Sequence, residues 1–117
     1  MRKLNTAINK KINEILPDVP VYPAIADADA AMPYVVYTDE SFTVDRTKDG
    51  PLERLHSVSV ELYVDDFDKG DEMADKLAEN MNCILAPGVY SLLMGGSSDY
   101  TGEGYVFKLD FDVEVDA

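Results

Sequence analysis

The sequence predicts an α+β fold, a two-layer sandwich in which two helices pack on a mostly antiparallel sheet of four or five strands. Two segments repeat apolar residues at helical spacing, and two others alternate apolar and polar residues as strands do. The expected order is α-β-β-β-α-β-β. A chain of 117 residues fits one domain, which we place over residues 1–117.

The first predicted helix covers residues 3–16, and Pro17 ends it because the residue before a proline disfavours helical backbone angles. Its apolar residues recur at spacings of three and four and would form one buried stripe: Leu4, Ile8, Ile12, Ile15 and Leu16. Residues 20–25 then predict an extended edge segment or a short edge strand, since the two prolines cannot donate hydrogen bonds to a sheet.

Four segments predict the main strands. Residues 33–38 are rich in β-branched and aromatic side chains, and this strand is expected to continue to Val44 with both faces covered. Residues 89–94 form a later strand, and residues 105–115 show the clearest alternation in the chain. In residues 53–64 one face would be buried, namely Val58, Val60, Leu62 and Val64.

The second helix is predicted to begin at the acidic residues 65–68, which suit the positive end of a helix dipole. It is expected to run to about Leu85, before Pro87-Gly88. Its apolar stripe would be Met73, Leu77, Met81 and Ile84. Together with the strands on either side, this helix is compatible with a parallel crossover.

The composition excludes several functions. A net charge of −13 argues against binding to a phosphate backbone or an anionic membrane. One His and one Cys (His56 and Cys83) are too few for a usual zinc site, and a single Cys cannot form an internal disulfide. No apolar run suits a signal peptide or a membrane helix, so a soluble protein made in a cytoplasm is expected. Separately, neither a cofactor nor catalytic activity is expected.

The acidic row Asp110, Asp112, Glu114 and Asp116 lies on one face of a strand, with carboxylates about 7 Å apart. Such a row does not converge on a cation without help from elsewhere, so a solvated surface is favoured over a metal site. A metal-dependent enzyme is therefore the least favoured function. His56 is expected to have a structural or surface role in place of a catalytic one, and Cys83 is expected to be a partly exposed, inert thiol.

Two loops are predicted to be exposed, and the family resemblance described below implies that such loops contact other subunits. For the second loop a long, flexible hairpin tip is equally favoured. The first spans residues 45–51, and its candidate contacts are Asp45, Arg46, Thr47, Lys48 and Asp49. The second is a glycine-rich connector over residues 95–104, which lacks the Lys-Ser/Thr of a phosphate loop. Its candidates are Gly95, Gly96, Asp99, Tyr100 and Glu103.

Charge is distributed unevenly. Residues 1–16 hold four Lys/Arg and one Glu, a net of +3, whereas residues 57–117 hold three Lys and fourteen Asp/Glu, a net of −11. The basic end of one copy could therefore bind the acidic face of the next. The candidate pairs are Arg2, Lys3 and Lys10 with Asp110, Asp112 and Glu114. The alternative is that these cations merely solvate a surface helix.

Several blocks together resemble a known family. Val21-Tyr22-Pro23 precedes Met32-Pro33-Tyr34-Val35-Val36-Tyr37, residues 57–64 form a strand before a helix, and Leu109-Asp110-Phe111-Asp112-Val113-Glu114-Val115 lies in the last strand. This arrangement resembles the small tail-completion, or tail-terminator-like, proteins encoded in the head–tail gene clusters of tailed phages and prophages. The resemblance covers nearly the whole chain.

The resemblance implies a structural protein that forms a ring, commonly a hexamer, at the head-facing end of the tail tube. Such a ring stops tube polymerisation and joins the tail to the head connector, so the implied partners are further copies of the chain, the tail tube protein and head connector proteins. DNA would pass through the ring without specific binding. The implied location is the head–tail junction of a virion made in the bacterial host cytoplasm. The alternative function is a small acidic adaptor or inhibitor that binds a basic protein.

Overall fold

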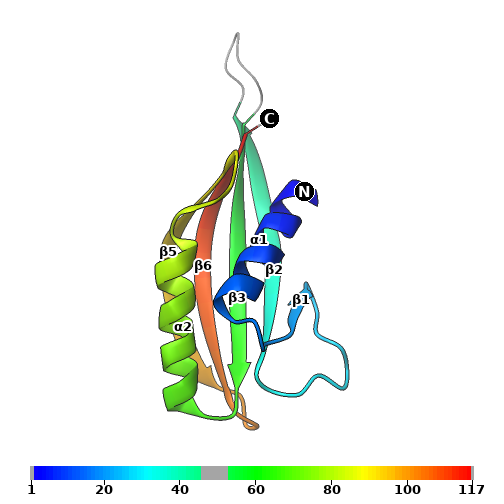
Figure 1. Cartoon of the computed structure of the whole chain (residues 1–117), viewed down its shortest axis with the longest axis vertical. Coiled ribbons are helices and arrows are strands. Elements are labelled where there is room, and N and C mark those ends of the chain that lie inside the picture. Colours follow the sequence, from blue (N-terminus) through cyan, green and yellow to red (C-terminus); the bar gives the residue numbers. More distant parts are fainter. Residues whose placement is uncertain (1, 46–52, 117) are drawn as a thin grey trace.

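The computed structural model describes residues 2–45 and 53–116, and in this part of the chain it contains two helices and six strands (Figure 1). The elements are α1 (Arg2–Ile15), β1 (Val21–Pro23), β2 (Tyr34–Asp45), β3 (Glu53–Val64), α2 (Phe67–Met81), β4 (Ile84–Ala86), β5 (Val89–Tyr100) and β6 (Tyr105–Val115). The α+β class is as predicted. The short strand β4 was not predicted, and it raises the number of strands to six.

All six strands form one sheet in the order β1-β2-β3-β6-β5-β4. Only β1 and β2 run parallel; the other neighbours are antiparallel. Strands β3 and β5 both pair with β6, so they are parallel to each other with β6 inserted between them. The segment β3–α2–β5 therefore joins two parallel strands, as the sequence suggested, but they are not adjacent.

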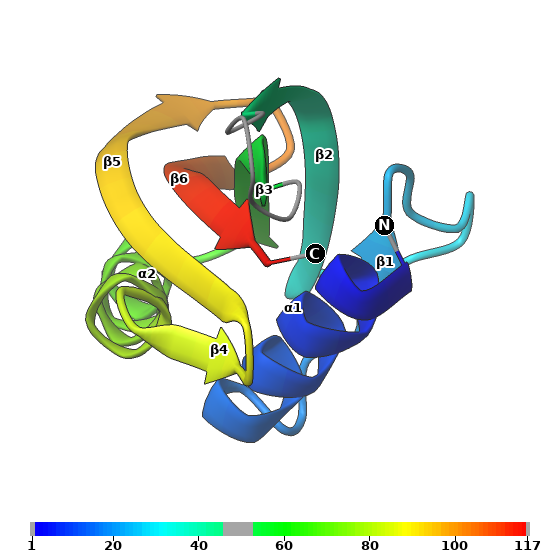
Figure 2. The same cartoon turned by 90° about the horizontal axis from the view of Figure 1, so that it is seen from above.

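Both helices lie on the same side of the sheet. Helix α2 packs on β6, β3 and β5, and α1 packs beside α2. Helix α1 also contacts β1 and β4, which are the two outer strands of the sheet. The sheet is curled, and α1 spans the space between its two edges (Figure 2).

The core lies between the helices and the sheet. The predicted stripe of α1 is confirmed, since Leu4, Ile8 and Ile12 are at most 1% exposed. The predicted buried face of β3 is confirmed as well, since Val58, Val60, Leu62 and Val64 are all buried. Each fully buried aliphatic side chain stabilises the fold by roughly 1.5–3 kcal/mol relative to exposure. These alternating apolar positions therefore determine which face of the sheet is covered.

Helix α2 begins as predicted. Asp66 is its N-cap, and the carboxylate of Asp66 accepts a hydrogen bond of 3.0 Å from the backbone N–H of Asp68. The predicted C-terminal end is wrong, because Asn82 leaves the helical region with φ −86° and ψ 67°. The next residues form β4, and Ile84 is 63% exposed instead of belonging to the buried stripe.

The predicted glycine-rich connector is also wrong in extent. Strand β5 continues to Tyr100, because it pairs with β6 from Val89↔Val115 to Tyr100↔Tyr105. Only residues 101–104 form the turn. A Cβ on Gly104 would overlap the backbone carbonyl of Val64, so this position of the turn requires glycine.

Strands β2 and β5 each contain a bulge. In β2 the register shifts between Asp39 and Ser41, and in β5 it shifts between Leu93 and Gly95. The extra residues are Glu40 and Met94. Bulges bend a strand and change which face the following side chains occupy. The two bulges lie at the same height along the sheet. Asp39 pairs with Val58 of β3, Val58 pairs with Phe111 of β6, and Phe111 pairs with Leu93.

Candidate assembly surface

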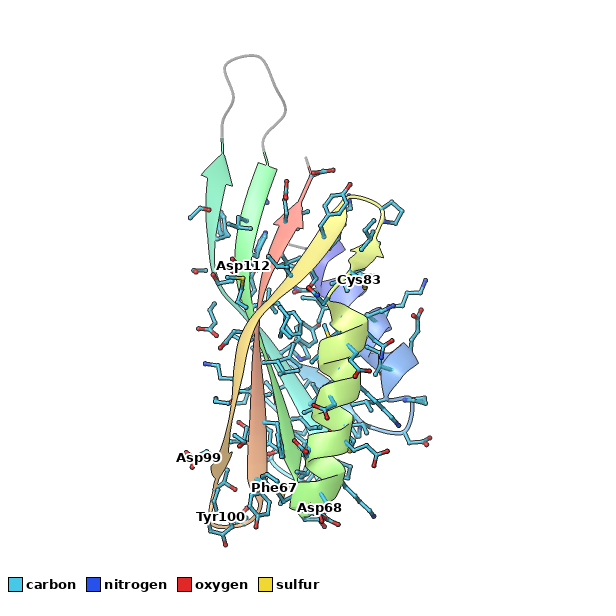
Figure 3. All side chains as sticks on the ribbon, turned by 90° about the vertical axis from the view of Figure 1, so that its left-hand side faces the viewer. Phe67, Asp68, Cys83, Asp99, Tyr100 and Asp112 are labelled. Atoms are coloured by element: carbon cyan, nitrogen blue, oxygen red, sulfur yellow. The ribbon has the colours of Figure 1, made fainter. Side chains whose placement is uncertain are left out.

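The face of the sheet that points away from both helices is called the open face here. Figure 3 shows Asp112 and Asp99 on this side, with α2 on the other. Strand alternation and register place the following side chains together on it: Tyr34, Val36, Thr38, Ser59, Glu61, Tyr63, Lys108, Asp110, Asp112 and Glu114. The open face therefore combines residues of three adjacent strands.

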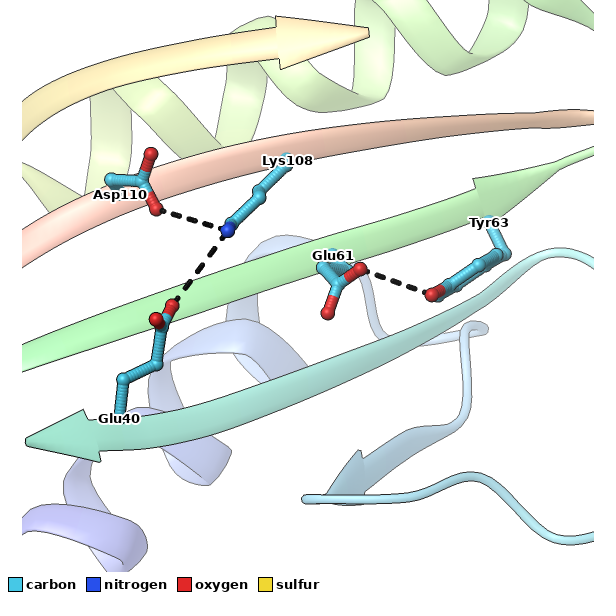
Figure 4. Close-up of polar contacts among 5 residues, drawn as sticks. All are labelled: Glu40, Glu61, Tyr63, Lys108 and Asp110. Carbon is cyan, nitrogen blue, oxygen red and sulfur yellow. Dashed lines mark hydrogen bonds and ion pairs between the residues drawn. The ribbon is translucent and has the colours of Figure 1, made fainter. Parts of the chain in front are cut away.

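The predicted acidic row of β6 lies on the open face, where Asp110, Asp112 and Glu114 are all partly buried. The Lys108 ammonium lies 3.8 Å from Glu40 Oε1 and 3.9 Å from Asp110 Oδ1 (Figure 4). These side chains are 41–49% exposed, so each pair stabilises the fold by at most about 1 kcal/mol. Within the described part of the open face Lys108 is the one cation, and the surface is strongly acidic.

The predicted cationic partners lie on a different side of the molecule. Lys3 and Lys10 are exposed on α1, which covers the other side of the sheet. Arg2 is the first residue of α1, and its side chain lies outside the described residues. Since the sheet separates α1 from Asp110, Asp112 and Glu114, these groups could pair only between copies. That contact stays a prediction.

Most of the predicted loop contacts lie either outside the described residues or in a strand. Arg46, Thr47, Lys48 and Asp49 lie outside the described residues, and Asp45 is the last residue of β2. Four candidates of the second loop lie in β5 instead of in a loop: Gly95, Gly96, Asp99 and Tyr100. Glu103 is exposed in the turn between β5 and β6, so it alone of that set occupies a loop.

A group of tyrosines lies at the β1 end of the open face. The rings of Tyr34 and Tyr63 stack with centroids 4.8 Å apart and planes 17° apart, and Tyr22 contacts Tyr34 edge-on at 6.2 Å. The Tyr63 hydroxyl donates a 3.0 Å hydrogen bond to Glu61 Oε2 (Figure 4). Burial, this hydrogen bond and the nearby negative charge raise the pKa of Tyr63 to about 12. The hydroxyl is therefore a stable donor to the carboxylate.

This tyrosine group borders a cavity of about 320 Å³. One wall is the segment after β1, and the other is the open face: Ala24, Ile25, Ala26, Asp27, Tyr34, Val36, Glu61 and Tyr63. The sequence did not single out this site, because its residues come from three separated segments. Glu61 and Tyr63, which alternate on one face of β3, were the part of the site that the sequence could indicate. The tyrosine group forms only because Tyr34 pairs with Tyr63 across β2 and β3.

His56 is structural in position, as expected, but it is fully buried. Its Nδ1 lies 2.8 Å from Asp39 Oδ2, across the β2–β3 pair. Within the described residues, His56 Nε2 and Asp39 Oδ1 have no hydrogen-bond partner. The ring of Phe42 packs against His56 with centroids 5.5 Å apart. This pair lies beside the β2 bulge.

Cys83 is exposed, in agreement with the sequence analysis, and its thiol donates a 3.1 Å hydrogen bond to the carbonyl of Asn80. Across residues 2–45 and 53–116, no three His, Cys, Asp or Glu side chains gather as metal ligands would. In the same part of the chain, neither helix has the length and apolar character needed to cross a membrane.

Comparisons with known proteins add one finding about the fold. Neither a protein-family model nor a curated protein matches the sequence. Among solved structures, the chain is similar to a chain in the virion of a native gene transfer agent particle, with a TM-score of 0.70 and 16% sequence identity. The superposition covers 91% of this chain and 84% of that one. At this low identity the likeness concerns the fold, and the chain thus has the fold of a gene transfer agent virion component over nearly its whole length.

Proposed function

We propose that this chain is a structural protein of a phage or phage-like virion, and that it completes the tail. In this role it caps the tail tube and joins it to the head connector at the head–tail junction, as a ring of identical copies. Its function is contact with other proteins, without catalysis.

The observation that carries the proposal is the match to a gene transfer agent virion chain over 91% of this sequence at a TM-score of 0.70. The Tyr-Pro and Pro-Tyr-Val-Val-Tyr segments, which resemble the tail-completion family, support the more specific role. They form β1 and the start of β2, the only parallel pair among the described strands. The open face, with its acidic row and tyrosine group, offers surface for subunit and partner contacts.

The proposal is tested in virions. A tagged copy of the chain should co-purify with intact tails, and cryo-electron microscopy should place its density at the end of the tube that faces the head. Deletion of the gene should give tubes of irregular length without attached heads. Normal particles from the deletion strain, or density elsewhere in the virion, would contradict the proposed role.

One observation favours the second candidate function, a small acidic adaptor or inhibitor of a basic protein. The open face carries Asp110, Asp112, Glu114 and Glu61 against Lys108 alone among its described side chains. An acidic surface of this kind selects basic partners and accelerates their association. Affinity capture from host cells that lack phage would separate the two functions, since an adaptor binds a host protein without any virion component.

A further inference from the structure

The cavity beside the tyrosine group contains the elements of a site for a cationic side chain. Its floor is Val36, which is 7% exposed although it lies on the open face. The stacked rings of Tyr34 and Tyr63 form one side, and the carboxylates of Glu61 and Asp27 contribute negative charge. Aromatic faces and carboxylates attract a guanidinium or ammonium group, and Arg uses such sites more often than Lys.

Among the described residues, no cation pairs with Glu61. Its direct neighbour across the β3–β6 pair is Lys108, but the Lys108 ammonium lies near Glu40 and Asp110 (Figure 4). Among the described residues, the recorded partner of the Glu61 carboxylate is the hydroxyl of Tyr63. One carboxylate oxygen therefore remains free to accept a charge-assisted hydrogen bond.

The wall formed by the segment after β1 is held in place by a strained turn. Ala24 has a φ of 68°, which is unfavourable for a residue with a Cβ. Its N–H donates a 2.8 Å hydrogen bond to the carbonyl of Tyr37, and the N–H of Ile25 donates to the carbonyl of Pro23 at 2.8 Å. The turn places Ile25 at the mouth of the cavity with 80% of its surface exposed. Such an apolar rim suits contact with a protein surface around the inserted side chain.

We propose that this cavity, called the tyrosine pocket, binds an arginine side chain of a partner protein. The guanidinium lies against the Tyr34–Tyr63 pair and bonds the free oxygen of Glu61, and the aliphatic stem packs on Val36. A volume of about 320 Å³ is at the small end of ligand pockets, which suits one side chain better than a nucleotide. Arginine binding by the tyrosine pocket does not depend on the proposed function. Only the expectation that the partner is a virion protein rests on the proposed function.

The test is a titration of the isotope-labelled full chain, followed by two-dimensional NMR, with N-acetyl-arginine methylamide. The neutral citrulline analogue, which has nearly the same shape, is the matched probe. We expect saturable shifts confined to the lining residues with the arginine probe and much weaker shifts with citrulline. Glu61→Gln should weaken binding about fivefold, as expected for a partly exposed ion pair. Glu79→Gln, which removes an exposed carboxylate from α2, should leave binding unchanged.

Tyr63→Phe is the second variant. It keeps the ring and frees Glu61 from its hydroxyl partner, so binding should be retained or tightened. Equal binding of citrulline, equal affinities of the Glu61→Gln and Glu79→Gln variants, or absence of saturable shifts would overturn the proposal. Shifts that map to Asp110, Asp112 and Glu114 would also overturn it, in favour of a diffuse acidic surface. If the titration fails but the chain co-purifies with tails, only the tyrosine-pocket proposal is refuted. If the titration succeeds but the chain never associates with tails, only the proposed function is refuted.

Discussion

The buried pair of His56 and Asp39 allows a stability prediction that follows directly from geometry. The imidazole is 0% exposed, and its one hydrogen-bond partner within residues 2–45 and 53–116 is Asp39 Oδ2 at 2.8 Å. Asp39→Ala removes that acceptor and leaves the ring buried without any partner. Leaving a buried polar group unsatisfied costs about 1–3 kcal/mol, so we expect the free energy of unfolding to fall by this amount.

A double-mutant cycle separates the hydrogen bond from other effects of the substitution. His56→Leu alone removes the polar ring and leaves Asp39, whose side chain is 20% exposed and whose Oδ1 is buried. This variant should lose about 1–3 kcal/mol, because the carboxylate of Asp39 loses its hydrogen-bond partner. In the His56→Leu background Asp39→Ala should then be nearly neutral. The expected coupling energy is about 1–3 kcal/mol, within the range for residues in direct contact.

Urea unfolding, followed by far-ultraviolet circular dichroism and tyrosine fluorescence, measures each free energy; the chain contains no Trp. Glu40→Ala is the matched control, since Glu40 is the next residue and makes an exposed ion pair 3.8 Å from Lys108. It should change stability by at most about 1 kcal/mol. If Asp39→Ala costs the same with and without His56, the two groups are not coupled and the reasoning is refuted.

Three further predictions follow. The pKa of Tyr63 is raised to about 12, so the stability linked to this hydroxyl is complete below the ordinary value of 10 and is lost as pH rises towards 12. Absorbance titration of the folded chain should detect that late ionisation, and Glu61→Gln should lower its pKa; an unchanged titration would exclude Glu61 as a cause. Gly70→Ala should destabilise the fold by about 1–2 kcal/mol, since a Cβ there overlaps Val64 and Phe107 and the overpacking outweighs the helix-propensity gain; a stabilised variant in urea unfolding would show that the contact relaxes freely. Leu77→Ala, at a position that is 0% exposed, should cost about 2–5 kcal/mol in the same assay, and a smaller loss would mean that the core collapses into the space.

Much of the fold was predictable because local periodicity and burial agree in most elements. The stripe of α1 and the alternation of β3 both identify the covered face, and Asp66 was recognisable as part of a helix start. The C-terminal half of β5 was not predictable from local preferences. Gly95 and Gly96 have low strand propensity, but pairing with eleven residues of β6 outweighs this preference.

The candidate site, like the fold, was only partly predictable from the sequence. The shared face of Asp110, Asp112 and Glu114 follows from their spacing along one strand and was predicted. The tyrosine pocket depends on the pairing of β2 with β3 and on the turn at Ala24, which are long-range and conformational facts. Ile84 was wrongly assigned to the helical stripe. Its spacing from Met81 fits a helix, but the helix ends at Asn82 before reaching it.

The two bulges determine which side of the sheet is occupied by the end of β2 and by the second half of β5. If β2 alternated regularly through Glu40, Phe42 would leave His56 and turn to the open face. Regular alternation through Met94 would similarly exchange the sides of the second half of β5. Asp39 and Ser41 pair with the adjacent residues Val58 and Ser57, so deletion of Glu40 should leave a regular strand in the same register. Deletion of Met94 should do the same in β5, since Leu93 and Gly95 pair with the adjacent residues Phe111 and Asp110.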